Sequence, residues 1–461
     1  MKPLVTTSLL CLFLILLSGS EVRAQNSLDT IKVLNDATAP KKRFWRASGE
    51  LLLVQLIPWS FNYFIRDADF AHISFASIGH NLQFKNWEFD DNKFTTNQFA
   101  HPYEGNLYFN SFRTNGYNFW QSAPAAFAGS YMWEVAGETN PPAPNDFINT
   151  SFGGISLGEM TYRVSNRIIN KKQRGFKRQL NEIAAMLIDP LNGFNRILDG
   201  QWGKVSNTVT DLDTISLGGE LELGFRRIGE KDGTIDEKGK TGWYARVRLL
   251  YGDPFEESKK PFNNFDVVVE LGDDDSTKLN VVRVNGLLTS WELEANERVD
   301  HLLALTLNYD FYNNASFEYG AQSVGLTLNS KFTPSKKTTI LTRVGVGGVI
   351  LAAVPDAYLY YGEGRNYDYG PGFTLTGAAG LLFANRLTWL NTYRGGWFTT
   401  INGNSSNHFL HTVSSELRVR LIQNISLGAE AGYFILHGNY RDYPDVNQKY
   451  PFGRLSLGIK I

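Results

Sequence analysis

The sequence predicts an outer-membrane β-barrel of about twelve antiparallel strands, with an α-rich N-terminal domain that plugs the lumen or docks on it. Three observations predict this fold. The N-terminus has the pattern of a secretory signal, the C-terminal half alternates between apolar and polar residues, and the chain ends on such an alternating segment. The expected parts are a signal peptide, a flexible leader, the α-rich domain and the barrel, at residues 1–24, 25–44, 45–200 and 210–461.

The signal consists of Lys2, an apolar stretch from Leu9 to Leu17 and small residues up to Ala24. This pattern is typical of a secretory signal peptide cleaved after Ala24, because the apolar stretch is shorter than the ~20 residues that a spanning helix needs. Cleavage would remove Cys11, the only cysteine. The mature chain would then form no disulfide and bind no zinc through cysteine. The expected location is the outer membrane of a Gram-negative bacterium.

The composition argues against a nucleic-acid partner. The 45 basic and 46 acidic residues nearly cancel, whereas a protein that binds nucleic acid carries a basic surface. The chain has 43 glycines and 13% aromatic residues, and no later segment is continuously apolar enough for a spanning helix. Such a composition suits a barrel, which shows lipid only every second residue of each strand. Outer-membrane lipid is therefore the expected partner, with envelope polysaccharide or another envelope protein as further candidates.

The strand pattern is clearest in residues 215–227. Leu221 and Leu223 share one face there, while Glu220 and Glu222 share the other, because side chains in a strand alternate with a period of two. Similar segments continue to the C-terminus, and their number is even, as single-chain bacterial barrels require. The twelve expected strands lie near 215–227, 241–252, 264–272, 279–293, 301–313, 316–331, 337–351, 372–384, 386–398, 408–421, 424–437 and 451–461.

The region before the barrel shows helical rather than alternating periodicity. In the last of its expected helices, Leu180, Ile183 and Leu187 share a face opposite Lys177 and Asn181. The four expected helices run over Ser48–Ile65, Tyr117–Glu138, Asp146–Ile169 and Gly175–Leu198.

Two groups of motifs resemble a known family. The first lies in residues 87–163 and includes His101-Pro-Tyr, Trp133-Glu and Gly158-Glu, and the second runs from Gly364 to Gly372. Together they resemble the family catalogued as domain of unknown function 3943, found among outer-membrane proteins of Gram-negative bacteria such as the Bacteroidetes. The resemblance covers roughly residues 45–200 plus scattered barrel positions. It implies location and architecture, and it brings no activity with it.

The N-terminal domain holds many polar residues among its aromatics. The functional candidates there are Asp90, Asp91, Asn97, His101, Tyr103, Arg113, Glu134, Glu138, Asp146, Glu159 and Arg163. If this domain fills the lumen, its charges must meet opposite charges on the inward barrel faces, because an unpaired buried charge is very costly. The expected pairings join Asp90, Asp91, Glu134 and Glu159 to Arg246, Arg248, Arg418 and Arg420, and join Arg113 and Arg163 to Glu220, Glu222 and Glu416.

The sequence leaves several functions open. The leading hypothesis is transport, export or envelope anchoring by a plugged barrel, and a structural or assembly role is a further alternative. A lipid- or envelope-modifying hydrolase would use His101 as a general base with Ser111 or Ser130 as nucleophile and Glu134 as the orienting carboxylate. No His-x-Ser pair supports this hypothesis, although His408 and His411 lie near serines.

Two smaller sites are also considered. His101 with Asp90, Asp91 or Glu104 offers metal ligands, but their spacing matches no established metal motif, so no cofactor is expected. The loop 355–372 combines tyrosines with Arg365 near Tyr367. Such a loop suits recognition of sugars or of a partner protein, or it folds back and caps the barrel.

Overall fold

The computed structural model describes residues 41–461 except 207–214, 237, 274–277, 317 and 359–364. The expected signal peptide and all but the last residues of the expected leader lie outside the described residues.

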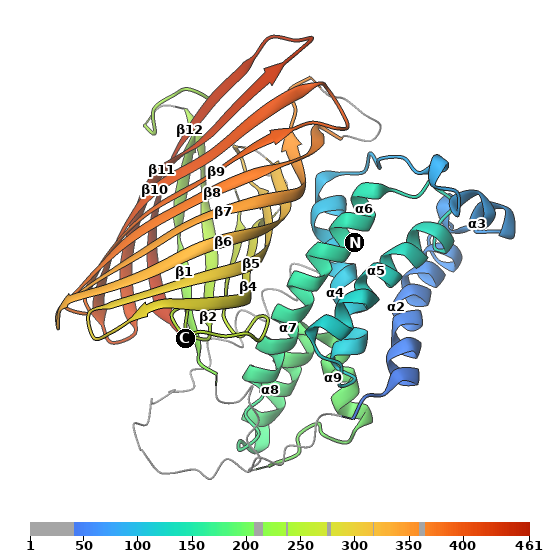
Figure 1. The fold of residues 1–461 in the computed structure, drawn as a ribbon, viewed down its shortest axis with the longest axis horizontal. Coiled ribbons are helices and arrows are strands. Elements are labelled where there is room, and N and C mark those ends of the chain that lie inside the picture. Colours follow the sequence, from blue (N-terminus) through green and yellow to red (C-terminus); the bar gives the residue numbers. More distant parts are fainter. Residues whose placement is uncertain (1–40, 207–214, 237, 274–277, 317, 359–364) are drawn as a thin grey trace.

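Twelve antiparallel strands form a closed barrel, which confirms the predicted fold class (Figure 1). Each strand pairs with its neighbours in sequence, and the last strand closes the barrel against the first in a register that places Leu221 opposite Ile459. The strands are β1 (Leu217–Gly229), β2 (Gly239–Tyr251), β3 (Phe265–Gly272), β4 (Leu279–Ala295), β5 (Val299–Asn313), β6 (Glu318–Ser335), β7 (Thr338–Pro355), β8 (Tyr367–Phe383), β9 (Leu387–Thr399), β10 (Ser406–Ile422), β11 (Ile425–Tyr440) and β12 (Val446–Lys460).

The two faces of the barrel wall follow the predicted alternation. Arg246 of β2 lies 3.2 Å from Glu430 of β11, and Arg248 lies 2.8 Å from Glu416 of β10. Such contacts between strands that are not neighbours are possible only across the lumen, so these side chains point inward. The alternate residues point outward, and Phe225 of β1 is 70% exposed. A closed antiparallel barrel with charged inner and apolar outer faces is the architecture of outer-membrane proteins.

The two ends of the barrel differ in their connections. One end has the short turns 296–298, 336–337, 384–386 and 423–424, the C-terminus of the chain and one long connection, 252–264, which contacts the helical domain. The other end has longer loops, including 230–238 and 356–366. In bacterial barrels the short turns are periplasmic and the longer loops extracellular, and we call the second end the long-loop end.

The N-terminal region is helical, as the sequence predicted; the first helix begins earlier than expected, and the other three expected helices are shorter or divided. Pro190 divides the last expected helix, because the side chain of Asp189 accepts a hydrogen bond from the backbone N–H of Asn192 and begins a new helix there. No described helix is both long and apolar enough to cross a membrane. The main helices are α2 (Phe44–Phe64), α3 (Phe75–Asn81), α4 (His101–Arg113), α5 (Phe119–Ala136), α6 (Pro144–Ile148), α7 (Gly154–Ile168), α8 (Gly175–Ile188) and α9 (Pro190–Leu198), with single π-helical turns η3 (Thr96–Ala100) and η4 (Asn149–Gly153).

Glycines allow the central helices to approach closely. A Cβ atom on Gly105 of α4 would lie 1.8 Å from the carbonyl oxygen of Thr150, and one on Gly154 would lie 2.5 Å from the Cα of Gly105. No side chain fits at these two positions, so α4 crosses η4 and α7 backbone against backbone.

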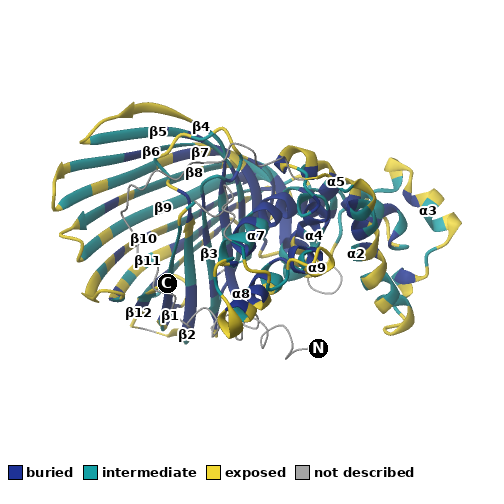
Figure 2. Cartoon of the chain, turned by 90° about the horizontal axis from the view of Figure 1, so that it is seen from below, coloured by how far each residue is buried: buried dark blue, intermediate teal, exposed yellow. Residues whose placement is uncertain are grey.

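The helical domain packs against the outside of the barrel wall, beside the barrel and not within it (Figures 1 and 2). Tyr251 of β2, Phe265 of β3 and Tyr309 of β5 alternate with inward residues, so they point outward, yet they are fully buried. They form one hydrophobic core with helical residues such as Phe109 and Phe119. The predicted plug is therefore wrong for the described residues, because apolar contact with the outer wall, and not charge pairing in the lumen, holds this domain.

The barrel fills its own lumen with paired charges. Glu270 pairs with Arg226, Arg246 at 2.8 Å and Arg454 at 3.4 Å, and Arg418 pairs with Glu220 at 2.7 Å. Arg246, Arg248 and Arg418 thus pair with glutamates of other barrel strands, so their predicted pairing with helical carboxylates is also wrong.

A layer of inward-facing apolar side chains closes the lumen toward the long-loop end. Its described members are Ile228, Tyr319, Ala321, Val349, Ala352, Val354, Phe398, Leu410, Phe434, Leu436 and Phe452. Beside the ion pairs lies a cavity of about 590 Å³, lined by polar residues such as Arg343, Arg394 and Thr376.

Candidate functional site

His101 lies at the centre of a cluster of acidic side chains in the helical domain. As the first residue of α4, directly after η3, its ring faces α6 and η4. Its Nε2 is 3.6 Å from a carboxylate oxygen of Asp146, and its Nδ1 is 3.9 Å from Glu104 and 3.4 Å from the hydroxyl of Thr150. Two segments of the chain, 101–104 and 146–150, therefore meet at this ring.

Further carboxylates surround this centre. Glu134 of α5 accepts a hydrogen bond of 2.7 Å from the backbone N–H of Ala143, just before α6. Burial raises the pKa of Asp146 well above its usual range, and the charges of Asp90, Glu138 and Glu104 raise it further. We call the group Asp90, His101, Glu104, Glu134, Glu138 and Asp146 the His101 cluster.

The cluster is acidic and lacks basic partners. Among the described residues, no lysine or arginine forms an ion pair with any of its carboxylates. Burial raises the pKa of Glu104 to about 7 and lowers the pKa of His101 to about 4. At neutral pH, His101 is therefore neutral and able to accept a proton, while part of the Glu104 population still holds one. Such a separation of titrating groups is typical of acid–base sites.

The cluster is not sealed from its surroundings. The side chain of His101 is 13% exposed and that of Glu104 is 22% exposed, whereas Asp146 is buried. The sequence predicts Glu104 only as a candidate metal ligand, and Thr150 and Asn145 are not among the predicted site residues. Glu104 directly follows His101-Pro-Tyr and lies three residues from His101 on α4, so a helical projection of that motif could have found it.

The barrel contributes directly to the surroundings of the cluster. Asn145 donates one hydrogen bond of 2.8 Å to Asp146 and one of 3.1 Å to the hydroxyl of Tyr369. Asn97 donates to the hydroxyls of Tyr367 and Tyr369 at 3.0 and 3.2 Å. Both tyrosines lie at the start of β8 and point out of the barrel, toward the helices.

The motif around Arg365 therefore fastens the helical domain to the barrel. Arg365 donates to the backbone oxygen of Asp90 at 3.4 Å and to the side chain of Asn402. Arg365 and Tyr367 are buried, so the hypothesis that they form an exposed recognition surface is wrong. The alternative, a segment folded back on the protein, is closer to the structure.

Three other predicted residues form a separate ion cluster. Arg113 and Arg163 both donate to Glu159, at 2.6 and 2.7 Å, and Arg163 also donates to the backbone oxygen of Pro261 at 2.8 Å. Burial opposes the charge of Glu159, but the two guanidinium groups hold its pKa below the usual range. This cluster joins α4, α7 and the connection between β2 and β3, so it links the helical domain to the barrel.

The structure does not bring the predicted serines to His101. Ser111 donates to the backbone oxygen of Tyr108 at 2.6 Å, and Ser130 donates to that of Phe147 at 3.5 Å. Asp91 and Tyr103 are exposed, outside the group in contact with His101. Within the described chain, the residues whose ligand atoms converge as a metal site requires are Asp356, Asp368 and His408, and not those around His101.

The outer surface of the helical domain is strongly apolar. Trp45 of α2 is 86% exposed and Phe176 of α8 is 77% exposed, and Leu53, Ile57 and Phe64 of α2 are exposed too. Helix α2 lies on the side of the domain away from the barrel (Figure 1). Soluble surfaces rarely carry such contiguous apolar groups, which mark contact with a membrane or a partner.

Several solved outer-membrane proteins resemble the barrel. NanC porin shares 10% identity at a TM-score of 0.28, over 52% of this chain and 100% of its own. The channel DcaP of Acinetobacter baumannii shares 9% identity at 0.26, over 54% and 97%, and KdgM porin shares 11% at 0.25, over 52% and 98%. These values indicate a general likeness in the barrel and support no conclusion about function.

No curated protein matches the chain. A family model does match, over residues 86–191, and these residues include the whole His101 cluster. The family is described as Domain of unknown function (DUF3943), and the match confirms the resemblance seen in the sequence motifs. Residues 86–191 therefore match the DUF3943 family model, and they lie on the outer wall of a twelve-stranded barrel.

Proposed function

We propose that the His101 cluster is the catalytic site of an enzyme that modifies an outer-membrane lipid, by hydrolysis of an ester near the head group. The observation that carries this proposal is the position of the cluster. It lies outside the barrel in a domain with an apolar surface, whereas the lumen is occupied by ion pairs and an apolar layer.

The apolar surface supports access from the membrane. The helices cover outward residues of β2 to β8 that would otherwise contact lipid, such as Phe265 and Tyr309. The uncovered parts of the same wall remain apolar, as at Phe225 and Leu457. The exposed side chains of α2 and α8 are apolar as well, so acyl chains are the partner that matches both surfaces.

The acid–base properties of the cluster support ester hydrolysis. Neutral His101 can take a proton from a water molecule whose oxygen attacks the ester carbonyl. The bond to the alcohol then breaks, and protonated Glu104 can give its proton to the leaving oxygen. The proton that His101 gained then passes to the carboxylate of Glu104, which restores both groups, so the cycle needs only water and the ester. Asp146, with a carboxyl oxygen 3.6 Å from His101 Nε2, can help to position the imidazole ring.

Transport through the lumen is the second candidate. The lumen cavity of about 590 Å³, with Arg343 and Arg394 in its wall, would suit a small anionic solute. The apolar layer that includes Phe398 and Phe434 would have to move before a solute could cross. The static arrangement therefore favours the lipid-modifying enzyme.

Mass spectrometry of lipid products tests the proposal. The purified full chain is reconstituted into vesicles of bacterial outer-membrane lipids, and wild type is compared with His101→Gln. The matched control is His72→Gln, because His72 is an exposed histidine of the same domain. We expect wild type and the control to form product and His101→Gln to lose at least 100-fold in rate. Equal turnover by His101→Gln, or no turnover by the folded wild type, would overturn the proposal.

A further inference from the structure

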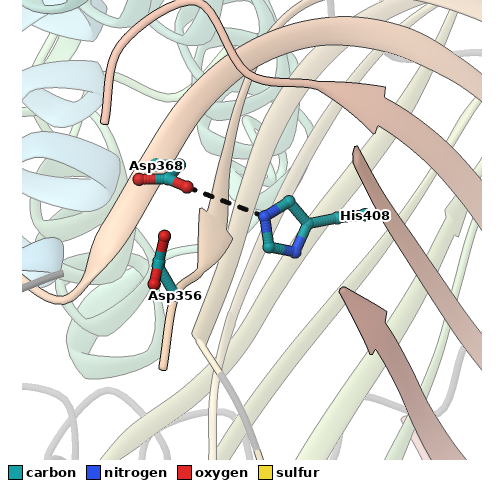
Figure 3. Close-up of side chains that lie close together, drawn as sticks. All are labelled: Asp356, Asp368 and His408. Atoms are coloured by element: carbon teal, nitrogen blue, oxygen red, sulfur yellow. Dashed lines mark ion pairs between the residues drawn. The ribbon is translucent and has the colours of Figure 1, made fainter. Parts of the chain in front are cut away.

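A second titratable cluster lies on the other side of the barrel wall, at the long-loop end. Its members are Asp356, directly after β7, Asp368 of β8 and His408 of β10 (Figure 3). Asp368 lies between Tyr367 and Tyr369 and points inward, while these tyrosines point outward to the helices. One carboxylate oxygen from each aspartate and one ring nitrogen of His408 all lie within 4.8 Å of one another.

The three side chains face one another in a buried space. Nε2 of His408 is 3.7 Å from Asp368, and Figure 3 shows the two aspartates on the same side of the ring. Asp368 and His408 are fully buried, and Asp356 is buried as well. None of the described lysines or arginines forms an ion pair with Asp368, and its titratable neighbours are the carboxyl of Asp356 and the imidazole of His408. Two buried carboxylates repel each other unless a cation or shared protons compensate.

The surrounding loop holds both carboxylates in place. The backbone N–H of Asn404 donates to Asp368 at 3.2 Å, and its side-chain amide donates to Asp356 at 3.0 Å. Ser406 lies between His408 and Asp368, with its hydroxyl 2.9 Å from His408 Nε2 and 3.3 Å from a carboxyl oxygen of Asp368.

Gly403, directly before Asn404, shows how closely the loop backbone packs against Asp368. Gly403 has a φ of +111°, and a Cβ atom there would lie 1.8 Å from a carboxylate oxygen of Asp368. The backbone can approach the carboxylate this closely only with glycine. The support extends beyond the three side chains, as is usual around metal ligands.

We propose that Asp356, Asp368 and His408 bind a divalent transition-metal cation of the zinc class. Two carboxylate oxygens and one imidazole nitrogen are three suitable ligands, and the hydroxyl of Ser406 or a water could complete a fourth. The cation would neutralise the facing carboxylates and join the ends of β7, β8 and β10. This site is independent of the His101 cluster and its proposed activity.

The site would stabilise the closed end of the lumen. Val354 and Leu410 belong to the apolar layer and lie two residues from Asp356 and His408, respectively, on the same inward faces. A cation bound by ligands at the ends of β7, β8 and β10 would therefore stabilise the apolar layer on its long-loop side.

Zinc titration of the full chain tests the proposal. The protein is purified in detergent, stripped with a chelator and titrated with Zn²⁺ in a calorimeter, and Co²⁺ is bound in parallel to record its ligand-field absorption. The variants are Asp368→Asn and His408→Gln. The control is His411→Gln, because His411 lies on the same strand but points outward, where it contacts Tyr393.

We expect one Zn²⁺ per chain for wild type and for the control, and at least a tenfold weaker affinity for the two variants. Heat-shifted migration on gels shows which variants retain the folded barrel. No Zn²⁺ bound by the folded wild type would overturn the proposal, as would equal affinity in the folded variants. If both variants fail to fold, the Co²⁺ spectrum of wild type decides: bands of a nitrogen- and oxygen-ligated ion support the site, and the spectrum of hydrated Co²⁺ overturns it.

Discussion

Tyr309 donates its hydroxyl to the backbone oxygen of Gln98 at 2.5 Å, and this bond crosses from the outer wall of the barrel to the helical domain. The next residue, Asp310, points the opposite way and lies 3.6 Å from Arg394 in the lumen. Successive side chains of β5 thus contact the helical domain on the outside of the barrel and the charged groups of the lumen on the inside. Because the helices pack on the outer face, the site around His101 lies outside the barrel wall and not in the lumen.

The close helix crossing can be tested with alanine substitutions. Gly105→Ala would place a Cβ atom against the backbone of Thr150, so we expect it to destabilise the helical domain by about 2 kcal/mol or more. Gly49→Ala is the control, because nothing lies within 4 Å of that position and alanine favours a helix by ~0.5–1 kcal/mol. Thermal unfolding followed by circular dichroism at the helical band measures both. Equal stability of the two variants would show that α4 and α7 do not cross as described.

The stability of the helical domain should depend on pH. Burial raises the pKa of Glu104 and of Glu50 to about 7, from a usual value near 4.5. A carboxyl group whose pKa is raised by folding contributes its full stabilisation of the folded state below pH 4.5, and this contribution is lost as the pH rises through 7. The lowered pKa of His101 acts oppositely, since its contribution is lost as the pH falls from 6.5 through 4.

We therefore expect the melting temperature of this domain to fall between pH 5 and pH 8. Glu104→Gln should reduce that fall, because glutamine does not titrate, and the exposed Glu88→Gln should leave it unchanged. Differential scanning calorimetry at several pH values measures the effect. A melting temperature that rises with pH over this range would contradict the described burial of the carboxyls.

The closed lumen predicts little steady conductance. The rings of Phe434 and Phe452 lie 4.7 Å apart within the apolar layer. The double variant Phe434→Ala and Phe452→Ala should raise single-channel conductance in a planar bilayer, because it opens space in that layer. Phe225→Ala is the control, since Phe225 points outward. A large and stable conductance of the wild type would instead favour transport and show that the layer does not close the lumen.

The proposed contact of α2 with lipid can be measured by spin labelling. Cys11 is the only cysteine, so single cysteines can be introduced in a Cys11→Ser background and labelled selectively. A label at Ile57→Cys should collide with oxygen more than with a polar nickel reagent, as should one at Leu223→Cys on the outer wall of the barrel. Lys85→Cys, an exposed position outside the apolar surface, should show the reverse. If the label at position 57 behaves like the label at position 85, α2 faces water, and access of a lipid to the His101 cluster from the membrane loses its support.

The sequence by itself determined the barrel. Period-two alternation placed Glu220 and Glu222 on the inner face and Leu221 and Leu223 on the outer face, because strand geometry allows no other arrangement. It also indicated an even number of strands, a helical N-terminal region and many of the polar residues that meet around His101. These properties are local, so the order of residues along the chain is enough to read them.

Only the tertiary structure decided where the helical domain lies and which charges pair. Glu159 could have joined Arg246 or Arg113 on grounds of charge, and the fold selects Arg113, because α4 and α7 cross directly at Gly105. Likewise Tyr251 and Tyr309 look like lipid-facing residues in the sequence, and contact with the helices buries them. Apolar residues pack equally well on lipid or on another apolar surface, so periodicity alone does not distinguish a wall that faces the membrane from a wall that holds a domain.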